Sequence, residues 1–189
     1  MRLRPATPED ATALAELFDL AGDGLPLHLW AHMAEPGETA LDVGRRRAGR
    51  DTGAFSWRNA TVIEAGGGVA ASLVGYALPE TPEPPDPTMP PMFRPLDELE
   101  RLAPGSWYVN ALAAYPRWRG QGLGTRLLAH AGELARAAGC RSTSIIVADT
   151  NEAARRLYQR TGHVERARRP AVNEDWSGTV REWVLLIRA

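Results

Sequence analysis

One glycine-rich segment of the chain offers backbone N–H groups to an anion. It reads Arg119-Gly-Gln-Gly-Leu-Gly124 and joins an apolar, strand-like stretch to an amphipathic, helix-like one. Gly122 and Gly124 allow a sharp turn and a close approach of the backbone to a ligand. The N–H groups that open the next helix and the positive end of its dipole would face that ligand, with Arg119 adding a positive charge. The segment therefore predicts a phosphate-binding loop; a turn that only joins strand to helix is the alternative.

Spacing and composition exclude two other phosphate-binding loops. A dinucleotide-binding fingerprint needs Gly-x-Gly-x-x-Gly after the first strand of a βαβ unit, whereas the glycines at 120, 122 and 124 lie two-thirds of the way along the chain. All 22 basic residues are arginines. The chain therefore offers neither the lysine of a P-loop nor a lysine for a Schiff base.

A second segment follows the next apolar stretch and reads Asn151-Glu-Ala-Ala-Arg-Arg-Leu-Tyr158-Gln-Arg-Thr-Gly162-His163. With the first segment, it resembles the GNAT superfamily of N-acetyltransferases over residues 107–163. The stretch from Leu112 to Arg119 is similar to the family's Leu-Ala-Val-x-Pro-x-x-Arg. The family's Arg/Gln-x-x-Gly-x-Gly/Ala and its Asn-x-x-Ala-x-x-Leu-Tyr-x-x-x-Gly-Phe are matched at Arg119, Gly122, Gly124, Asn151, Ala154, Leu157, Tyr158 and Gly162.

The resemblance implies an α/β fold of the α+β type. It has a central mixed, mostly antiparallel sheet of about seven strands, flanked by helices, with strands four and five splayed apart. One N-acetyltransferase domain would span residues 1–189, with a Pro-rich insertion at about 79–95. In this family the cosubstrate acetyl-CoA lies between the splayed strands. By resemblance, its binding residues are Leu112, Ala113, Ala114, Arg119, Gly120, Gln121, Gly122, Leu123, Gly124, Thr125, Asn151 and Tyr158.

The same resemblance gives these residues roles. Backbone groups of residues 112–114 would pair with the pantetheine arm like an added strand, and an N–H group there would stabilise the developing oxyanion. Tyr158 is the expected catalytic residue, because its hydroxyl would protonate the departing thiolate. A core aromatic with a satisfied hydroxyl is the alternative. Asn151 would bind the arm or the adjacent backbone, cap the helix, or do both.

The attacking amine must lose a proton, since an alkyl amine with a pKa of about 10.4 is mostly protonated at pH 7. Many members of the family carry a carboxylate two residues before the Leu of Leu-Ala-Val. Here that position is Asn110, which cannot act as a base, so no base is assigned. The side chains that could replace it, each with a surface or core role as the alternative, are Glu64, Tyr108 with ordered water, His28, His32 and Glu35.

The implied reaction is transfer of an acetyl group to the primary amine of a small molecule, by direct attack in a ternary complex. A peptide or protein amine as acceptor, or a non-catalytic acyl-CoA-binding module, are the alternatives. No thiol acyl-enzyme is expected, because the only cysteine, Cys140, lies apart from both motifs. Side chains of the variable regions would frame an amine, pack in the core or form a homodimer surface: Trp30, Trp57, Trp176, Asp175, Glu174, Met89, Met92 and Phe93.

Hydrophobic spacing and turn signals predict the elements that position these residues. Strands are expected at 2–4, 61–64, 71–78, 107–114, 144–148, 163–168 and 182–188. Helices are expected between Thr7 and Gly22, over 96–102 and 125–138, and between Asn151 and Gly162, whereas 25–34 fits a helix or an irregular loop. Prolines make 79–95 an extended loop. His163 is expected to be a half-buried histidine at a strand start.

Composition narrows the class of protein. The net charge of -1 argues against a surface that binds nucleic acid. No apolar run approaches the roughly 20 residues of a membrane helix, and the N-terminus lacks the apolar stretch of a signal peptide. The single cysteine favours a reducing cytoplasm. We therefore expect a cytoplasmic protein without nucleic-acid or membrane partners. No metal is expected, because His28 and His32 lack a third ligand, and the arginines of 44–52 fit a solvated helix face better than an anion site.

Overall fold

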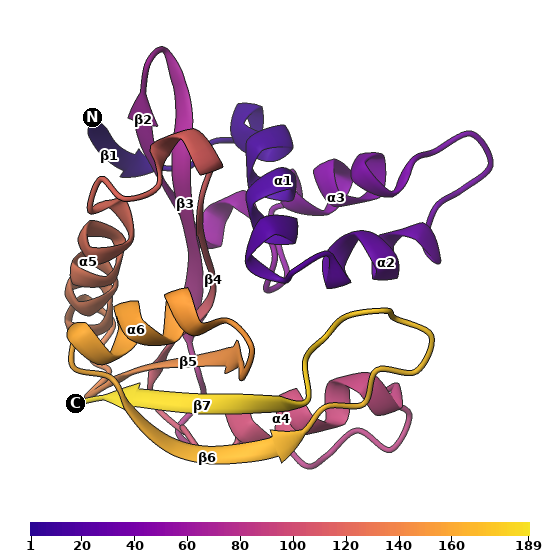
Figure 1. Ribbon diagram of the computed structural model, residues 1–189, viewed down its shortest axis with the longest axis vertical. Helices are drawn as coiled ribbons and strands as arrows, with labels where there is room; N and C mark the ends of the chain where they lie inside the picture. Colours follow the sequence, from indigo (N-terminus) through magenta and orange to yellow (C-terminus); the bar gives the residue numbers. More distant parts are fainter. The chain divides into compact units, whose positions relative to one another are not determined.

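The computed structural model describes residues 1–189, and its strands form a seven-stranded sheet in the order β1-β2-β3-β4-β5-β7-β6 (Figure 1). The strands are β1 (Arg2–Pro5), β2 (Ala60–Ala65), β3 (Gly68–Ala77), β4 (Trp107–Ala114), β5 (Thr143–Ala148), β6 (Val164–Pro170) and β7 (Glu182–Arg188). Strands β4 and β5 are parallel, whereas β1–β2, β2–β3, β5–β7 and β6–β7 are antiparallel pairs. The predicted mixed, mostly antiparallel sheet flanked by helices is confirmed.

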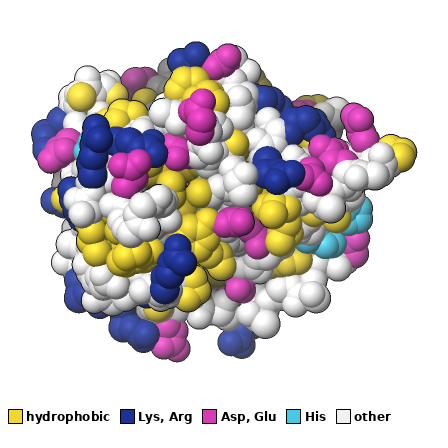
Figure 2. All heavy atoms as spheres, turned by 90° about the horizontal axis from the view of Figure 1, so that it is seen from above, with side chains coloured by type: hydrophobic (Ala, Val, Ile, Leu, Met, Phe, Trp, Pro, Cys, Tyr) yellow, Lys and Arg dark blue, Asp and Glu magenta, His cyan; other side chains and the backbone are white.

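The helices fall between these strands. They are α1 (Ala11–Ala21), α2 (Leu25–Ala31), α3 (Ala40–Ala48), α4 (Arg94–Glu100), α5 (Leu123–Ala137) and α6 (Glu152–Arg160). None of them has the length and the apolar character that a crossing of the bilayer requires. On the face drawn in Figure 2, basic and acidic side chains are interspersed.

The chain forms two compact units, each built from two separate segments. The first unit contains Met1–Gly75 and Asn110–Leu127, and the second contains Tyr76–Val109 and Leu128–Ala189. The boundaries between the units lie inside β3, β4 and α5 rather than in linkers. One domain over the whole chain stays a prediction.

Local signals at the start of the first unit place its first helix. Thr7 is an N-cap residue with extended backbone, Pro8 opens a 3-10 turn, and Asp10 completes a capping box. The Asp10 carboxylate also accepts two hydrogen bonds from the Arg4 guanidinium, at 2.7 and 2.9 Å, and Arg4 Nε donates to Glu64 at 2.8 Å. These contacts join β1, the turn before α1 and β2.

The core of the first unit is aromatic. The rings of Phe18 and Phe55 have centroids 4.1 Å apart, and Trp30 stacks on Phe55 at 5.7 Å. Trp30 is 4% exposed and packs in a cluster with Val43, which itself is fully buried. Of the segment 25–34, which fits a helix or a loop by its sequence, residues 25–31 form α2 and pack beside α3 (Figure 1).

The second unit places helix α4 against the strands β5, β6 and β7. Leu99 of α4 and Leu185 of β7 are fully buried in one cluster. The parallel pairs of β4 and β5 run from Trp107↔Thr143 to Val109↔Ile145, beyond which β4 continues to Ala114 and β5 to Ala148. The last part of the Pro-rich segment departs from the expected extended loop, because a 3-10 turn forms at Pro91–Phe93 and α4 begins at Arg94.

The arginines of residues 44–52 lie mainly on the last turn of α3. Arg45 pairs with Asp42, and Arg46 bonds Glu38 at 3.0 Å. Both arginine side chains are about half exposed. Arg45 and Arg46 agree with the expected solvated helix face, whereas Arg47 on the same turn is partly buried.

Candidate active site

In the first unit, strand β4 leads into the glycine-rich segment through a 3-10 turn at Pro116–Trp118. Gly120 and Gly122 adopt positive φ angles of 74° and 77°, which L residues with a side chain rarely adopt. A Cβ atom added at either glycine would meet no protein atom within 4 Å. The two glycines are therefore required by the backbone turn, and the space above them is open to a ligand.

The turn differs in one respect from the sequence interpretation. Helix α5 begins at Leu123, so Leu123, Gly124 and Thr125 form its first turn rather than the end of the loop. Gly124 does not have a positive φ angle. The sharp turn is thus made by Gly120 and Gly122, and Gly124 is a helical residue, because two left-handed glycines already complete the change of direction.

Several backbone N–H groups lie close together where the glycine-rich segment leads into α5. The N–H of Arg119 donates to the Pro116 carbonyl at 3.2 Å, and the N–H of Arg126 donates to Gly122 at 3.0 Å, closing the first helical turn. Between them, the N–H groups of residues 120–125 donate to no backbone carbonyl. Such a run of unpaired donors at a helix N-terminus carries partial positive charge and suits a phosphate.

The polar side chains of the loop turn back towards the backbone. Arg119 Nε donates to the carbonyl of Ala114 at 3.2 Å, at the end of β4. Gln121 Nε2 donates to the Arg117 carbonyl at 3.3 Å. Both side chains are exposed, so they surround the loop without covering its N–H groups.

Along β4, side chains alternate between two faces as in any strand. Ala111 and Ala113 are buried at 7% and 8% exposure. Asn110, Leu112 and Ala114 on the other face are only partly buried. Leu112 and Ala114 thus lie on the more open face of the strand, and Ala113 lies on the core face.

The two predicted residues of the later motif belong to the second unit. Asn151 caps α6, because its side-chain oxygen accepts a hydrogen bond from the Ala154 N–H at 3.1 Å. The capping role expected of Asn151 is confirmed. Tyr158 is 4% exposed, its ring lies edge-on to His163 at 6.0 Å, and burial raises the pKa of its hydroxyl.

Two of the bases considered from the sequence have structural contacts or an exposed position. Glu64 lies on β2 and forms an ion pair with Arg4 at 2.8 Å. Glu35 is exposed, and its backbone N–H donates to Glu38. Asn110 is partly buried on β4 and offers no basic group.

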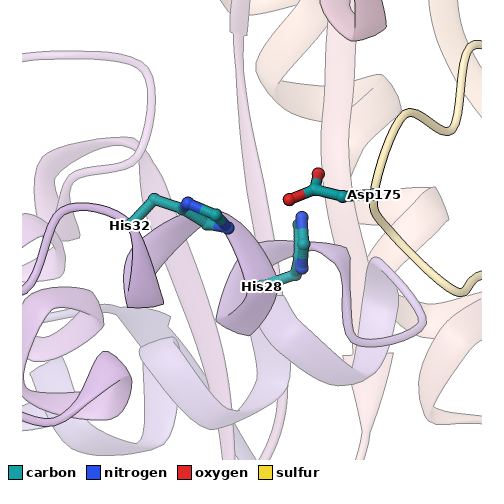
Figure 3. Close-up of side chains that lie close together, drawn as sticks. All are labelled: His28, His32 and Asp175. Atoms are coloured by element: carbon teal, nitrogen blue, oxygen red, sulfur yellow. The ribbon is translucent and has the colours of Figure 1, made fainter.

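Of the two histidines of the early segment, His28 lies on α2 and His32 is the residue that ends it. His28 and His32 project from successive turns, with ring centroids 4.9 Å apart in an edge-to-face arrangement (Figure 3). Asp175, the third residue labelled in Figure 3, lies in the loop between β6 and β7 and belongs to the second unit.

A carboxylate that the sequence interpretation missed lies beside Tyr108 in the second unit. Tyr108 is 4% exposed and shares a side-chain hydrogen bond with Glu100, the last residue of α4. Burial and the neighbouring Asp97 raise the pKa of Glu100 to about 7. Nothing in the sequence marks Glu100, because it is one of several acidic residues in a short helix.

Several other candidates have structural positions. Trp30 belongs to the core of the first unit, so its packing alternative is the right one. Met92 and Trp176 are also buried, at 6% and 8% exposure. His163 is buried rather than half-buried, at 3% exposure. The reason is that its ring nitrogens lie 3.2 Å from the Thr143 and Thr161 hydroxyls, inside the second unit.

Comparison with known proteins places the chain among acetyltransferases. The model of the acetyltransferase (GNAT) family matches residues 31–163, a range that includes both motifs. A structure of an N-acetyltransferase from Staphylococcus aureus Mu50 has a TM-score of 0.68 at 20% identity, covering 99% of this chain and 100% of that one. The comparison with curated proteins finds no match.

Two further solved structures have a similar fold. A candidate phosphinothricin N-acetyltransferase has a TM-score of 0.60 at 21% identity, covering 99% of this chain and 96% of the other. The protein yncA from Salmonella typhimurium, solved with its cofactor acetyl-CoA, has a TM-score of 0.59 at 19% identity, covering 99% and 92%. At these identities the likeness concerns the fold.

Proposed function

Because the chain belongs to the GNAT family of acetyltransferases, it is an acyltransferase of a family that uses acetyl-CoA, and we propose that it acetylates the primary amine of a small molecule. The acetyl group passes to the amine by direct attack in a ternary complex. The observation that carries this proposal is the run of unpaired N–H groups at residues 120–125, above which the space is open.

The residues of the first unit suit the phosphate end of the cosubstrate. Gly120 to Thr125 would hold the pyrophosphate by their N–H groups, and the exposed Arg119 would add charge near it. Backbone groups of residues 112–114 would pair with the pantetheine arm as an added strand does. When bound, acetyl-CoA supplies an activated thioester; the protein supplies position and charge.

The residues of the second unit suit the departure of the thiol. Asn151 caps α6 and orients the helix that carries Tyr158. Burial raises the pKa of the Tyr158 hydroxyl and so keeps its proton available. Tyr158 is the proposed general acid, which donates this proton to the sulfur as the C–S bond breaks. No nucleophilic side chain is needed, because the amine itself attacks.

The name of one protein with a similar fold favours a small-molecule acceptor over a peptide. Phosphinothricin, for which one of the similar structures is named, is a small amine. We therefore expect an amine of this size to be the better acceptor. A thiol-release assay with glutamate, glucosamine, tyramine, spermidine and a short peptide with a free N-terminus tests this part directly.

The phosphate-binding part is tested by a matched pair of glycine substitutions. Gly122→Ala puts a Cβ into the open space above the unpaired N–H groups and strains a φ angle of 77°. Gly67→Ala, in the turn between β2 and β3, strains a φ angle of 80° and likewise meets nothing within 4 Å. Each substitution is expected to lower the free energy of unfolding by about 1–2 kcal/mol.

Only Gly122→Ala is expected to weaken acetyl-CoA binding, by about tenfold in Kd, while Gly67→Ala leaves it unchanged. Isothermal titration calorimetry measures both. Equal affinities in the two variants would contradict the assignment of the loop. Tight binding of acetyl-CoA without thiol release for any amine would instead indicate a binding module.

A further inference from the structure

A buried phenol and a carboxylate of the second unit form a pair that the proposed mechanism does not yet use. Tyr108 lies on β4, is 4% exposed, and its hydroxyl interacts with the side chain of Glu100. The ring of Tyr76, from β3, lies edge-on to Tyr108 with centroids 5.8 Å apart. Glu100 is the group that forms a side-chain hydrogen bond with the Tyr108 hydroxyl.

Tyr108 is placed on the strand that would hold the acetyl group. It precedes Asn110 by two residues, so both side chains lie on the same face of β4. Its hydroxyl also interacts electrostatically with the hydroxyl of Tyr158, the proposed acid. Tyr108 is the next titratable group along the face of β4 that carries Asn110.

Glu100 connects this buried phenol to solvent. It lines a pocket of about 360 Å³ formed by the Pro-rich segment and α4, together with Leu78, Glu83, Met89, Arg101 and Pro104 among others. Tyr108 is not among the lining residues, so Glu100 is the member of the pair that reaches the pocket. A proton on Glu100 can thus exchange with water in the pocket.

Resting on the proposed function, we propose that Tyr108 and Glu100 carry away the proton of the attacking amine. The amine N–H bond breaks and its proton passes to the Tyr108 oxygen, while the Tyr108 O–H proton passes to the Glu100 carboxylate. Glu100 then releases it to water. The balance is that an alkylammonium loses two protons: one is released by this route, and the other replaces the proton that Tyr158 gives to the thiolate.

The charges around Glu100 suit a base that works near neutral pH. Burial and Asp97 raise the pKa of Glu100 to about 7, and the Tyr108 hydroxyl acts in the opposite direction. Arg101 binds the Asp97 carboxylate at 2.6 Å, and so offsets part of its charge. The other charged groups lie on α4 and on the strands packed against it. Two sets are ion-paired: Glu98 with Arg169, and both Glu165 and Glu182 with Arg168. The remaining ones are Arg94, Arg166 and Arg188.

The experiment compares Glu100→Gln and Tyr108→Phe with Glu98→Gln, an exposed neutralisation on the same helix. CoA release is followed from pH 5.5 to 9 with the best acceptor of the amine panel. Glu100→Gln and Tyr108→Phe are expected to lower kcat about 100-fold or more. In the wild type, kcat/KM is expected to increase with pH, with the midpoint of the increase near pH 7. Glu100→Gln is expected to remove this rising limb of the pH profile. Glu98→Gln keeps both rate and profile.

Two readouts do not depend on turnover. Carboxyl carbon NMR of the unliganded protein should show one glutamate signal whose titration midpoint is near pH 7. This signal should be absent in Glu100→Gln, and its midpoint should move to higher pH in Tyr108→Phe. Calorimetry should give the same acetyl-CoA affinity for all variants within about twofold. Retained affinity also shows that the variants are folded.

The outcomes separate this inference from the function on which it rests. An active wild type with unchanged rate and pH profile in both Glu100→Gln and Tyr108→Phe overturns the proton route and leaves the acetyltransferase proposal intact. A wild type that releases no CoA with any amine overturns both. If Glu100→Gln does not fold, Tyr108→Phe and the wild-type profile decide, and a profile without a limb near pH 7 overturns the route.

Discussion

At the scale of single residues, burial determines what the titratable side chains can do. Tyr158 and Tyr108 are each 4% exposed, and desolvation raises the pKa of both hydroxyls. A phenol in this setting keeps its proton until a strong acceptor is next to it. A thiolate leaving in the same desolvated environment is such an acceptor, which is why Tyr158 suits an acid better than a base.

Tyr158→Phe is expected to lower kcat about 100-fold and to change the Kd for acetyl-CoA less than about twofold, because the hydroxyl acts only as the C–S bond breaks. Steady-state kinetics and calorimetry measure the two quantities. Tyr115→Phe is the control, since it removes a hydroxyl that bonds Glu16 in the first unit. Unchanged turnover in Tyr158→Phe would remove the assignment.

At the scale of elements, close packing of two helices constrains a glycine that lies inside one of them. Gly44 is buried on α3, and a Cβ there would lie 2.4 Å from the Trp30 ring of α2. Real Cβ atoms do not approach a ring so closely, and the ring is itself packed against Phe55. The glycine is therefore required by the contact between the helices and not by its φ angle.

Gly44→Ala is expected to lower the free energy of unfolding by about 1–3 kcal/mol, although alanine favours a helix over glycine by about 1 kcal/mol. Gly132→Ala in α5 is the matched comparison, because its Cβ would meet only the flexible end of Arg136 at 3.7 Å. That substitution is expected to stabilise the protein by up to about 1 kcal/mol. Urea unfolding tests both, and equal effects of the two substitutions would contradict the packing argument.

At the scale of the whole molecule, a buried histidine and a partly buried glutamate contribute with opposite signs to how stability depends on pH. Burial lowers the pKa of His163 from 6.5 to about 4, and the nearby charge of Arg188 acts in the same direction. Between these values the unfolded chain binds a proton that the folded protein does not. The contribution of the neutral His163 to the free energy of unfolding is therefore fully present above pH 6.5. It is lost as the pH falls towards 4.

His163 is expected to contribute a loss of about 3 kcal/mol of unfolding free energy between pH 6.5 and 4, whereas Glu100, with its raised pKa, contributes in the opposite direction as the pH falls from 7. Unfolding by urea at a series of pH values measures the slope. His163→Gln keeps a polar group beside Thr143 and Thr161 but cannot be protonated, so the unfolding free energy of the wild type relative to this variant should fall between pH 6.5 and 4. Parallel slopes in the two proteins would show that the pKa of His163 is not depressed.

Much of the fold was predictable because its signals are local. Thr7 and Pro8 begin the first helical segment, Asn151 caps α6, and strand 107–114 was expected with the bounds that it has. Each of these features depends on residues a few positions away, through a cap, a fixed φ angle or an alternating pattern. The family resemblance likewise rests on motifs within short segments, and the family match confirms it.

The remaining features depend on residues that are distant in the sequence. The sequence by itself determined the strands, the helix caps and the glycine-rich turn of this acetyltransferase. Only the tertiary structure decided that Trp30 and His163 are buried, that Gly124 is helical, and that Glu100 lies beside Tyr108. The physical reason is that burial, and the pKa shift that follows from it, is created by side chains from other elements, which no local pattern encodes.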